Sequence, residues 1–566
     1  MAIANQDGNR RRPRAAEELV LLPLGGCGEI GMNSYLYGLG RGQRKRWLMV
    51  DFGVKFGDER DPGIEVILPD TQFIESQRND LEAIVLTHAH EDHFGAVSYL
   101  WPRLRVPVYA TPFAAWLLRD RLRESGLEDE VPLHEVPVGS RVAIGGFDVE
   151  FIPVTHSIPE SNALAIRTEA GTVLHSGDWK LDDRPMAGRP MAIDRLQVLA
   201  EEGCRALVCD STNALREGES PSESDAAVGL AEVIAGAKQR VAVTIFASNV
   251  GRILAVARAA QETGRHMVVA GRAFSRILEA ARDTGYLPPD MEFLPPTEFG
   301  YLPPDKVICL CTGSQGERRA ALARIADGSH PDIALEEGDL VIFSAKTIPG
   351  NEKAVFAVQN KLAELGIHIV TAEQHLVHVS GHPRRQELAR FYDWVRPELL
   401  VPMHGEAMHM LEQASLAQAC GIPETLIVRN GEVARLAPGP AEVLDEAPAG
   451  RLHVDGRLIV PSDGPAKVRR KMSFAGFVAV SIVLNRKGDL VGEPLIETAG
   501  LPETTEDGQP FRELLLSYVD AIIDGMAKPR RREDQPVETA LYQGIRKAAE
   551  LHWGKKPMCR IFLNRI

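Results

Sequence analysis

The chain has 566 residues, 44% hydrophobic and 25% charged, which is typical of a globular protein with several domains. Its formal net charge of −14 argues against a polycation that coats nucleic acid, although a local patch and a metal centre can still bind phosphate. We find no run of about 20 apolar residues, so no membrane span is expected. Seven scattered cysteines predict a reducing, cytoplasmic environment without disulfides.

The first residues, 1–18, are polar and rich in arginine, and we predict a disordered tail without a secretory signal. Short runs with β-branched residues follow, bounded by Gly, Pro or charge, as is typical of strands. The expected strands are Leu19–Leu24, Ser34–Tyr37, Trp47–Asp51, Ala83–Thr87, Val108–Ala110, Val149–Val154, Ala163–Thr168 and Thr172–Ser176.

A glycine-rich segment, Gly26–Gly31, matches the dinucleotide-binding fingerprint, and Asp51 follows at a suitable distance. That fingerprint requires a helix to begin at the last glycine. Because Asn33–Tyr37 and Trp47–Asp51 are both predicted strands, no helix has room to form. The sequence therefore excludes a Rossmann site here.

Four ligand-type side chains stand close together after the apolar run Ala83–Leu86, at His88, His90, Asp92 and His93. Imidazole and carboxylate groups are suited to Zn²⁺. At an extended strand end, His88 and His90 can share one metal, and Asp92 and His93 can face a second after the chain turns. The alternative is a polar loop with fortuitous histidines, in which four unpaired groups would repel one another or need partners.

Three more candidate ligands each follow a β-rich run, where loops gather at one end of a sheet. They are His156, Asp178 and His404. A lone His or Asp in such a place is ordinarily structural, but together the three complete a two-metal set.

This order of residues, beginning at Asp51, resembles the metallo-β-lactamase fold. The resemblance implies that the three histidines His88, His90 and His156 hold one zinc. Asp92 and His93 would help to hold the other, with Asp178 bridging both and Asp51 orienting a ligand from behind. His90 stands where the flavodiiron branch has Glu, which favours zinc over iron redox chemistry.

The gap between Asp178 and His404 is 404 − 178 = 226 residues, enough for an inserted domain. Its surroundings resemble the β-CASP nucleases, in which Asp210 matches motif A, His382 motif B and His404 motif C. Over nearly its full length the chain resembles bacterial ribonuclease J. The matching segments are Gly25–Asn33, Asp210–Ala214, Phe246–Asn249, Thr312–Glu317, Ile348–Glu352 and His378–His382.

The resemblance implies a ribonuclease with 5′→3′ exonuclease activity, preferring a 5′-monophosphate, and with endonuclease activity, in RNA maturation and decay. It implies two zinc ions per chain, a homodimer or homotetramer, and association with other RNA-decay proteins. Near Gly63, Glu65 and Asp455 some relatives carry a structural cation, so Ca²⁺ is one alternative there and an ordinary surface is the other.

The catalytic candidates are His382 as general acid, Asp210 as the group that positions it, and Asp92. We expect free backbone N–H groups at the helix start after Pro383 to form a phosphate cradle with the preceding segment. The residues expected to contact substrate are His378, Val379, Ser380, Gly381, His382, Ser248, Asn249 and Ser314, with Val379 acting through its backbone or packing.

The predicted fold class is α/β: a metallo-β-lactamase αββα sandwich with an inserted β-CASP α/β domain and a small α+β C-terminal domain. Alternating helical and apolar segments over 211–370 support the parallel inserted layer. The expected boundaries are 19–210 and 371–436 for the sandwich, 211–370 for the insertion, 437–464 for a linker and 465–566 for the C-terminal domain. The last domain should hold a hairpin at Phe474–Leu484 and Leu490–Thr498, helices at Phe511–Met526 and Pro536–His552, and a strand at Met558–Leu563.

Three other functions remain open at this point. One is a β-CASP nuclease that acts on DNA, or on RNA only internally, because recognition of the 2′-hydroxyl leaves no clear sequence signal. Another is a small-molecule hydrolase of the same fold, which the 226-residue gap (404 − 178) disfavours. A non-catalytic RNA-binding scaffold is the third, and the presence of every expected ligand argues against it.

Overall fold

The computed structural model describes residues 17–348 and 350–566. The predicted tail lies outside these ranges except for its last two residues, and strand β1 begins at Glu18. The chain divides into two compact units. The first comprises Met1–Lys55 and Leu68–Gly450, and the second comprises Phe56–Ile67 and Arg451–Ile566.

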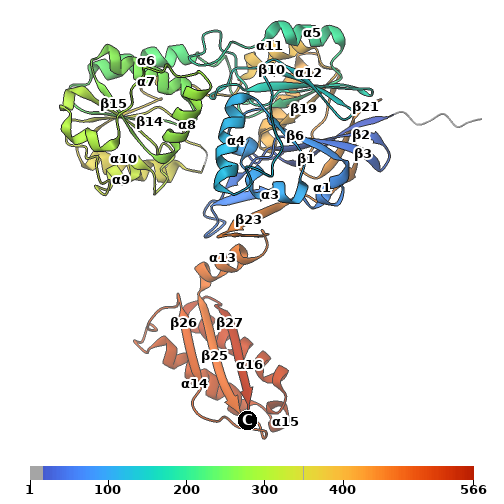
Figure 1. Cartoon of the computed structure of the whole chain (residues 1–566). Helices are drawn as coiled ribbons and strands as arrows, with labels where there is room; N and C mark the ends of the chain where they lie inside the picture. The colour runs from blue at the N-terminus through green and yellow to red at the C-terminus, as the bar shows by residue number, and fades with distance from the viewer. Residues whose placement is uncertain (1–16, 349) are drawn as a thin grey trace, which may run out of the picture. The chain divides into compact units, whose positions relative to one another are not determined.

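Two β-sheets of the first unit face each other across a buried core (Figure 1). The larger sheet has the strand order β22 (Glu442–Glu446), β21 (Glu432–Ala437), β1 (Glu18–Gly25), β2 (Ser34–Arg41), β3 (Arg44–Val50), β6 (Leu81–Val85), β7 (Val108–Ala110) and β8 (Leu133–Glu135). The second has the order β20 (Glu424–Thr425), β19 (Leu399–Met403), β13 (Ala206–Asp210), β12 (Gly171–His175), β11 (Asn162–Thr168), β10 (Phe147–Pro153) and β9 (Arg141–Ile144). Leu21 and Tyr37 of the first sheet share this core with Phe151 and Val208 of the second.

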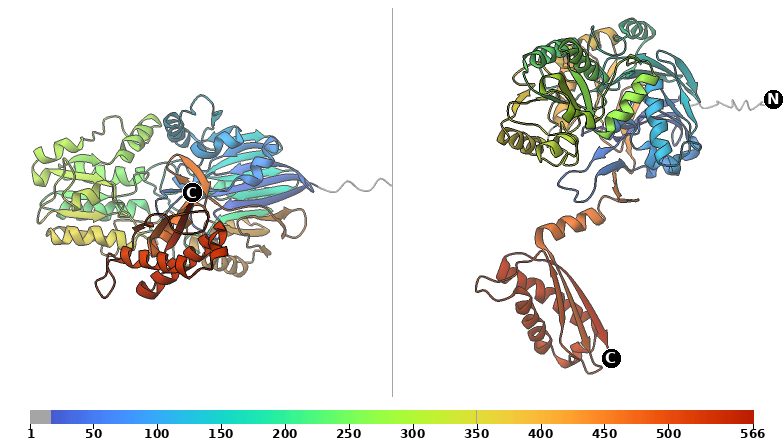
Figure 2. Two further views of the ribbon diagram at one scale, coloured as in Figure 1. Left: turned by 90° about the horizontal axis from the view of Figure 1, so that it is seen from below. Right: turned by 60° about the vertical axis from the view of Figure 1, so that its left-hand side comes forward.

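Helices cover the outer faces of both sheets (Figure 2). Beside the larger sheet lie α1 (Gln72–Ser76), α2 (Glu91–Phe94), α3 (Val97–Leu104) and α4 (Pro112–Glu124). Beside the second lie α5 (Ile193–Glu202), α11 (Arg385–Val395) and α12 (Ala407–Ala419). Leu199 of α5 and Phe391 of α11 pack on this second face, because each amphipathic helix buries its apolar stripe there. The expected αββα sandwich is confirmed.

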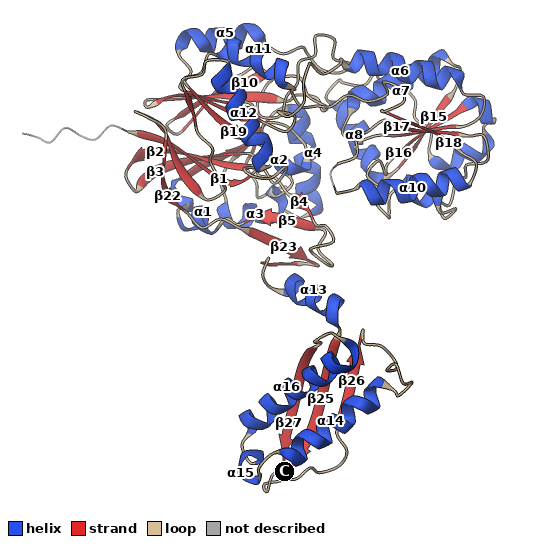
Figure 3. Cartoon of the chain, turned by 180° about the vertical axis from the view of Figure 1, so that it is seen from behind, coloured by secondary structure: helices blue, strands red, loops and turns tan. Residues whose placement is uncertain are grey.

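A separate parallel sheet forms the inserted layer, with helices on both of its faces (Figure 3). Its strand order is β15 (His266–Ala270), β16 (Val307–Cys311), β14 (Val241–Thr244), β17 (Leu340–Phe343) and β18 (His368–Thr371). Its helices are α6 (Glu223–Gly236), α7 (Val250–Glu262), α8 (Arg272–Asp283), α9 (Ala321–Ala326) and α10 (Glu352–Glu364). Cys309 and Cys311 are buried in it as expected, and all seven cysteines are free.

The second unit contains a three-stranded sheet with two long helices packed on one face. Its elements are β26 (Leu495–Ala499), β25 (Phe477–Leu484), β27 (Met558–Arg565), α14 (Phe511–Gly525), α15 (Lys528–Arg531) and α16 (Asp534–Trp553). The predicted helices and final strand are confirmed, and the hairpin is present with its second strand beginning at Leu495 instead of Leu490. Helix α13 (Pro465–Ala475) was not expected, and it includes Phe474, which we had placed in the hairpin.

The expected linker, 437–464, contains regular structure. It holds β22 and two strands of a four-stranded sheet whose order is β24 (Leu458–Pro461), β23 (Arg451–Asp455), β5 (Val66–Pro69) and β4 (Lys55–Phe56). All five residues of β22 are exposed and three of them are acidic, so the apolar alternation that reveals a strand is weak there. Among the described residues, no helix is both long and apolar enough to cross a bilayer.

Candidate metal centre

The ends of parallel strands bring distant ligand candidates to one edge of each sheet. β12, β13 and β19 run parallel, and Asp178 follows the first, Asp210 ends the second and His404 follows the third. In the facing sheet β3 and β6 also run parallel, so Asp51 and His88 follow neighbouring strand ends. All five residues are therefore gathered at the edge where loops leave the two sheets.

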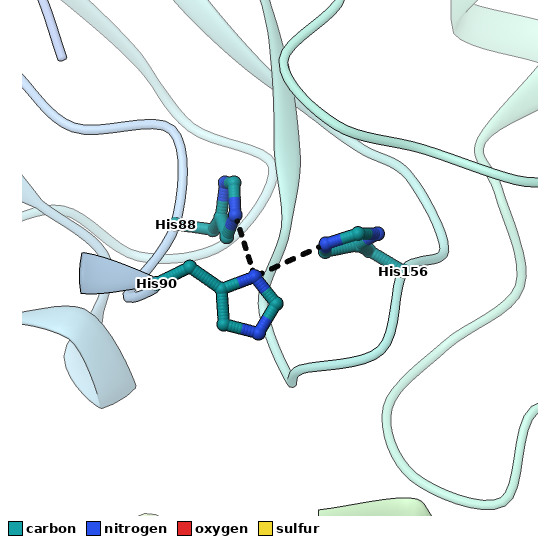
Figure 4. Close-up of side chains that lie close together, drawn as sticks. All are labelled: His88, His90 and His156. Atoms are coloured by element: carbon teal, nitrogen blue, oxygen red, sulfur yellow. Dashed lines mark hydrogen bonds between the residues drawn. The ribbon is translucent and has the colours of Figure 1, made fainter. Parts of the chain in front are cut away.

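The first ligand group consists of three imidazoles, from the buried His88 and the half-buried His90 and His156 (Figure 4). His90 Nδ1 lies 3.1 Å from His88 Nε2 and 3.1 Å from His156 Nε2. Burial lowers the pKa of His90 to about 4 and the pKa values of His88 and His156 well below their ordinary value. His156 Nδ1 donates to the carbonyl of Gly381 at 2.6 Å, which leaves the Nε2 lone pair facing the group. Neutral imidazoles in this arrangement are in the form that binds a metal.

The second ligand group mixes imidazoles and carboxylates, from Asp92, His93, Asp178 and His404. His93 Nε2 lies 3.2 Å from Asp178 Oδ2, and His404 Nε2 lies 3.2 Å from Asp92 Oδ2. Burial by itself would lower the pKa values of His93 and His404. The nearby carboxylates, Asp178 first, outweigh burial, so that the pKa of His93 is raised and that of His404 is raised to about 10. The buried carboxylates thus create a negative potential that a cation would neutralise.

Asp178 faces both groups. Its Oδ2 atom lies 3.8 Å from His156 Nε2 and 4.0 Å from His88 Nε2 as well as close to His93. Its Oδ1 atom is buried, makes no hydrogen bond in the described part of the chain and lies 3.3 Å from His404 Nδ1. A buried carboxylate whose two oxygens are surrounded by imidazole nitrogens fits a metal ligand shared between two sites.

Asp51 lies behind the second group and orients one of its ligands. Its Oδ2 accepts from His93 Nδ1 at 2.7 Å and from the Thr87 hydroxyl at 2.8 Å, and its Oδ1 accepts from the Thr87 backbone N–H at 2.8 Å. This arrangement fixes the His93 tautomer, with Nε2 directed toward the cluster. Asn33 also contacts that atom, with its Nδ2 3.0 Å away; the sequence analysis included Asn33 in a family-like segment but gave it no role.

His382 lies beside both groups and is bound by a buried carboxylate. Its Nδ1 lies 2.7 Å from Asp210 Oδ2, and Asp210 is buried. Burial acts in the opposite direction, but the Asp210 carboxylate raises the pKa of His382. Gly381 must be glycine, because a Cβ there would come within 2.7 Å of the His156 ring.

Four family models match successive parts of the chain. They are described as Metallo-beta-lactamase superfamily (28–191), Ribonuclease J, beta-CASP domain (238–362), Zn-dependent metallo-hydrolase RNA specificity domain (359–425) and Ribonuclease J C-terminal domain (467–566).

Curated relatives match over almost the whole chain. Ribonuclease J of Sinorhizobium meliloti is 48% identical over 551 residues, which cover 97% of this chain and 98% of that protein. The chain belongs to the ribonuclease J family. Ribonuclease J of Mycolicibacterium smegmatis is 38% identical over 92% of this chain and 93% of its own length. Ribonuclease J of Thermus thermophilus is 33% identical over 98% of this chain and 96% of its own length.

A solved structure from Enterococcus faecalis, titled as a protein of unknown function, shares the fold. It aligns with a TM-score of 0.51 at 18% identity over 74% of this chain and all of that one. As a ribonuclease J family member, the chain is a metal-dependent ribonuclease of the metallo-β-lactamase fold. Both ligand groups fit this assignment because their donor atoms are those that divalent metals bind.

The phosphate cradle that we expected from the residues at the start of α11 is not formed by the N–H groups of that helix end. The backbone N–H groups at the start of α11 are not free to bind phosphate. Those of Arg384, Arg385 and Gln386 donate to the Glu387 carboxylate, the Arg216 carbonyl and the Gly218 carbonyl. Residues 216–220 pack against this helix end, an arrangement of distant segments that the local sequence does not reveal.

Four other residues that we expected to contact the substrate have the following surroundings. Ser248 Oγ lies 3.2 Å from His90 Nε2, and Asn249 caps α7 by accepting from the Arg252 N–H at 2.9 Å. Val379 is buried, as its expected packing role requires. Ser314 is also buried, and its side-chain hydrogen bond among the described residues is with Gln315. Its contact with RNA stays a prediction.

A buried charge network connects the loop that follows Asp178 to the His378–His382 segment, and the sequence analysis did not predict it. Lys180 Nζ lies 3.0 Å from Asp182 and 4.0 Å from Glu223, and Glu223 pairs with Arg252 at 2.7 Å. Arg252 then donates to the carbonyl of Val377 at 2.8 Å. The two positive and two negative side chains balance, so the network can persist in the interior.

Positive charge also gathers beside this segment. Burial lowers the pKa of Lys346 to about 8, and the nearby charges of Arg216 and Arg384 act in the same direction. No pattern in the sequence indicated this cluster, because its members come from three separate loops.

The expected alternative of a calcium site is not favoured. Asp455 Oδ2 accepts from Arg469 Nη2 at 2.6 Å, and the Arg469 side chain also lies closest to Gly63. A guanidinium therefore supplies the positive charge that Ca²⁺ would bring, and the structure supports the alternative of an ordinary surface.

Proposed function

We propose that the chain uses two zinc ions to hydrolyse RNA, removing nucleotides from a 5′-monophosphorylated end and also cutting internally, in RNA maturation and decay. The observation that carries the proposal is the shared position of Asp178 between two ligand groups, with the His382–Asp210 pair beside them. In this proposal His88, His90 and His156 hold one zinc, Asp92, His93 and His404 hold the other, and Asp178 contacts both.

Bound zinc would supply the Lewis acidity that lowers the pKa of water toward about 7 and offsets charge on the phosphoryl oxygens. The chain's own residues supply the proton and the orientation. His382 has a raised pKa and so keeps a proton near neutral pH, which it can donate to the leaving 3′-oxygen. Asp210 accepts from His382 Nδ1 and thereby directs Nε2 toward the substrate. Ser248, beside His90, is placed to contact the RNA close to the cut.

The experiment that tests the proposal maps products from end-labelled RNA. We expect mononucleotides from the 5′ end of 5′-monophosphorylated RNA, slower release from 5′-triphosphorylated RNA, and no comparable release from matched DNA. The His90→Ala variant should be inactive. Equal rates on DNA and RNA, or full activity in the variant, would contradict the proposal. The homodimer or homotetramer implied by the family resemblance stays a prediction.

A further inference from the structure

Arg252 of the inserted layer is a fully buried arginine that holds the start of the His378–His382 segment. It lies in the first turn of α7, where its backbone N–H donates to the Asn249 side chain at 2.9 Å. Its guanidinium Nη1 donates to the Val377 carbonyl at 2.8 Å and to the Ser344 hydroxyl at 2.5 Å. The Ser344 hydroxyl donates to the same carbonyl at 2.6 Å. Two donors therefore fix the backbone just before that segment.

The same guanidinium faces the ring of His378. Its Nη1 atom lies 3.5 Å from His378 Nδ1, and His378 is half-buried. Burial lowers the pKa of His378 well below its ordinary value, and the nearby positive charges of Arg252, Lys180 and Lys346 act in the same direction. Arginine has donors only, so the neutral ring turns an unprotonated Nδ1 toward it and carries its proton on Nε2. His378 is thereby held as a hydrogen-bond donor, the form that a phosphate oxygen requires.

A buried carboxylate keeps the guanidinium in this position. Glu223 of α6 is 4% exposed, and it accepts from Arg252 Nη2 at 2.7 Å and from Arg252 Nε at 3.3 Å. The backbone N–H of Glu223 donates to Asp182 at 2.8 Å, and Lys180 Nζ lies 3.0 Å from the same carboxylate. Asp182 and Lys180 lie in the loop that follows Asp178 in the sandwich. The arginine is thus fixed relative to a loop of the sandwich as well as to its own layer.

The charged side chains of this network are costly to bury. Apolar side chains of similar volume often replace a buried ion pair without loss of stability, so stability alone explains the network poorly. An apolar set cannot supply a fork of N–H groups that holds a carbonyl, a hydroxyl and an imidazole in one arrangement. The geometry at Val377 and His378 is therefore the property that requires arginine.

A second buried arginine of the inserted layer, Arg265, provides a comparison. Its guanidinium donates to the carbonyls of Ala237 at 2.5 Å and Gln239 at 2.8 Å. Arg265 directly precedes β15, at the edge where the parallel strands begin, whereas Ser344 directly follows β17, at the edge where they end. Arg265 thus supports the same layer at the opposite edge of its sheet from the contact with His378.

We propose that Arg252 is a positioning residue for RNA cleavage that acts through His378. It holds the ring and the preceding carbonyl so that His378 donates its Nε2–H to a phosphate oxygen of the RNA. Glu223 holds the guanidinium in turn, so the alignment depends on the inserted layer and the sandwich together. The inference rests on the proposed function, and it assigns to the inserted layer a part in orienting a substrate contact of the His378–His382 segment.

A double-mutant cycle between Arg252→Gln and His378→Ala tests the inference. Each single variant should lower kcat/KM for 5′-monophosphorylated RNA about 10–100-fold, the range of one hydrogen bond to a charged group. The double variant should lose no more than the more affected single variant, because the two residues act through one contact. Arg252→Lys keeps the charge but not the fork, so its kcat/KM should lie between those of Arg252→Gln and the unmodified protein.

Arg265→Gln is the matched control, and thermal unfolding and metal content are measured for every variant. Arg265→Gln should lower the unfolding temperature as Arg252→Gln does, while its kcat/KM stays unchanged. Metal content should not change, because Arg252 makes no hydrogen bond or ion pair with either ligand group in the described part of the chain. If Arg252→Gln does not fold, Arg252→Lys takes its place in the cycle with the same expectation.

Three results would overturn the inference. Losses that multiply in the double variant would show that Arg252 does not act through His378. An equal loss of kcat/KM in Arg265→Gln would assign Arg252 to the stability of the layer alone, and loss of metal from Arg252→Gln would place its effect at the metal centre. If the unmodified protein bound metal but cleaved no RNA, the proposed function would fall and the inference with it, an outcome that is distinct from the other three.

Discussion

The two ligand groups of the metal centre lie side by side but differ in charge. His88, His90 and His156 form a group of imidazoles alone, and burial lowers their pKa values. In the second group the carboxylates of Asp92 and Asp178 raise the pKa of the neighbouring histidines. Each group combines buried and half-buried residues, so the difference comes from the carboxylates rather than from solvent.

This difference predicts that metal binding displaces protons from the second group but not from the first. The first offers neutral nitrogens near neutral pH, so a metal can bind there without displacing protons. The second holds protons on its histidines until a metal replaces them. Substitutions that affect one group, both or neither can therefore test the comparison.

The largest effect is expected from Asp178→Asn, because Asp178 faces both groups. Loss of this carboxylate should lower metal content at both and reduce kcat by more than the about 10²–10⁴-fold that a single general acid contributes. Metal analysis and RNA cleavage measure the two effects. Asp183→Asn, at an exposed position in the same loop, is the matched control. Retention of both metals in Asp178→Asn would refute the shared role.

Asp210→Asn removes no ligand of either group, although it takes away the carboxylate 3.7 Å from His404 Nδ1, and it should weaken the chemistry. Without the carboxylate, the pKa of His382 falls, so the histidine loses its proton at lower pH. The alkaline limb of the pH–rate profile therefore shifts to lower pH. His382→Ala should cost about 10²–10⁴-fold in kcat. The pH–rate profile and metal content together check this prediction. A lower rate with an unmoved alkaline limb would mean that Asp210 does not act through His382.

Asp51→Asn should disturb the second group alone. The amide cannot accept from both His93 Nδ1 and Thr87 in the same way, so His93 loses its fixed orientation. Removing such a partner typically costs about 10–100-fold in metal affinity or activity. Titration with a competing chelator should show one weakened metal and one unchanged. Equal weakening of both would contradict the separation of the groups.

The last prediction concerns the unmodified protein and is a difference in pH dependence. The pKa of His404 is about 10 without metal, so His404 is protonated throughout the neutral range and a metal must displace that proton. Affinity at the second group should therefore rise about tenfold per pH unit for each displaced proton. The pKa of His90 is about 4, so affinity at the first group should stay nearly constant between pH 6 and 8. Chelator competition at both pH values measures the two slopes, and parallel slopes would refute the comparison.

The sequence allowed most of the metal centre to be predicted. The residues from His88 to His93 form one short motif, Asp178 and His404 each follow a β-rich run, and Asp210, indicated by the β-CASP resemblance, ends the strand between theirs. Parallel strands end at a common edge, so their positions in the chain imply that they meet. The inserted layer could also be predicted, because buried parallel strands are continuous apolar runs.

Other features could not be predicted because their partners lie far apart in the chain. Glu387 binds the N–H groups of Leu181, Ser220 and Arg384, and these hydrogen bonds close the helix start that we expected to bind phosphate. Strand β22 was also missed, because an exposed, acidic edge strand lacks the alternation of a half-buried one.

By itself the sequence indicated which side chains form the two candidate ligand groups, because ligand chemistry and strand ends are both visible in the local sequence. Only the tertiary structure decided what surrounds them: the network through Arg252, the contact of its guanidinium with His378 and the closed start of α11. The physical reason is that each depends on charges or hydrogen bonds between segments brought together by packing. A residue type alone does not say which distant partner will neutralise it.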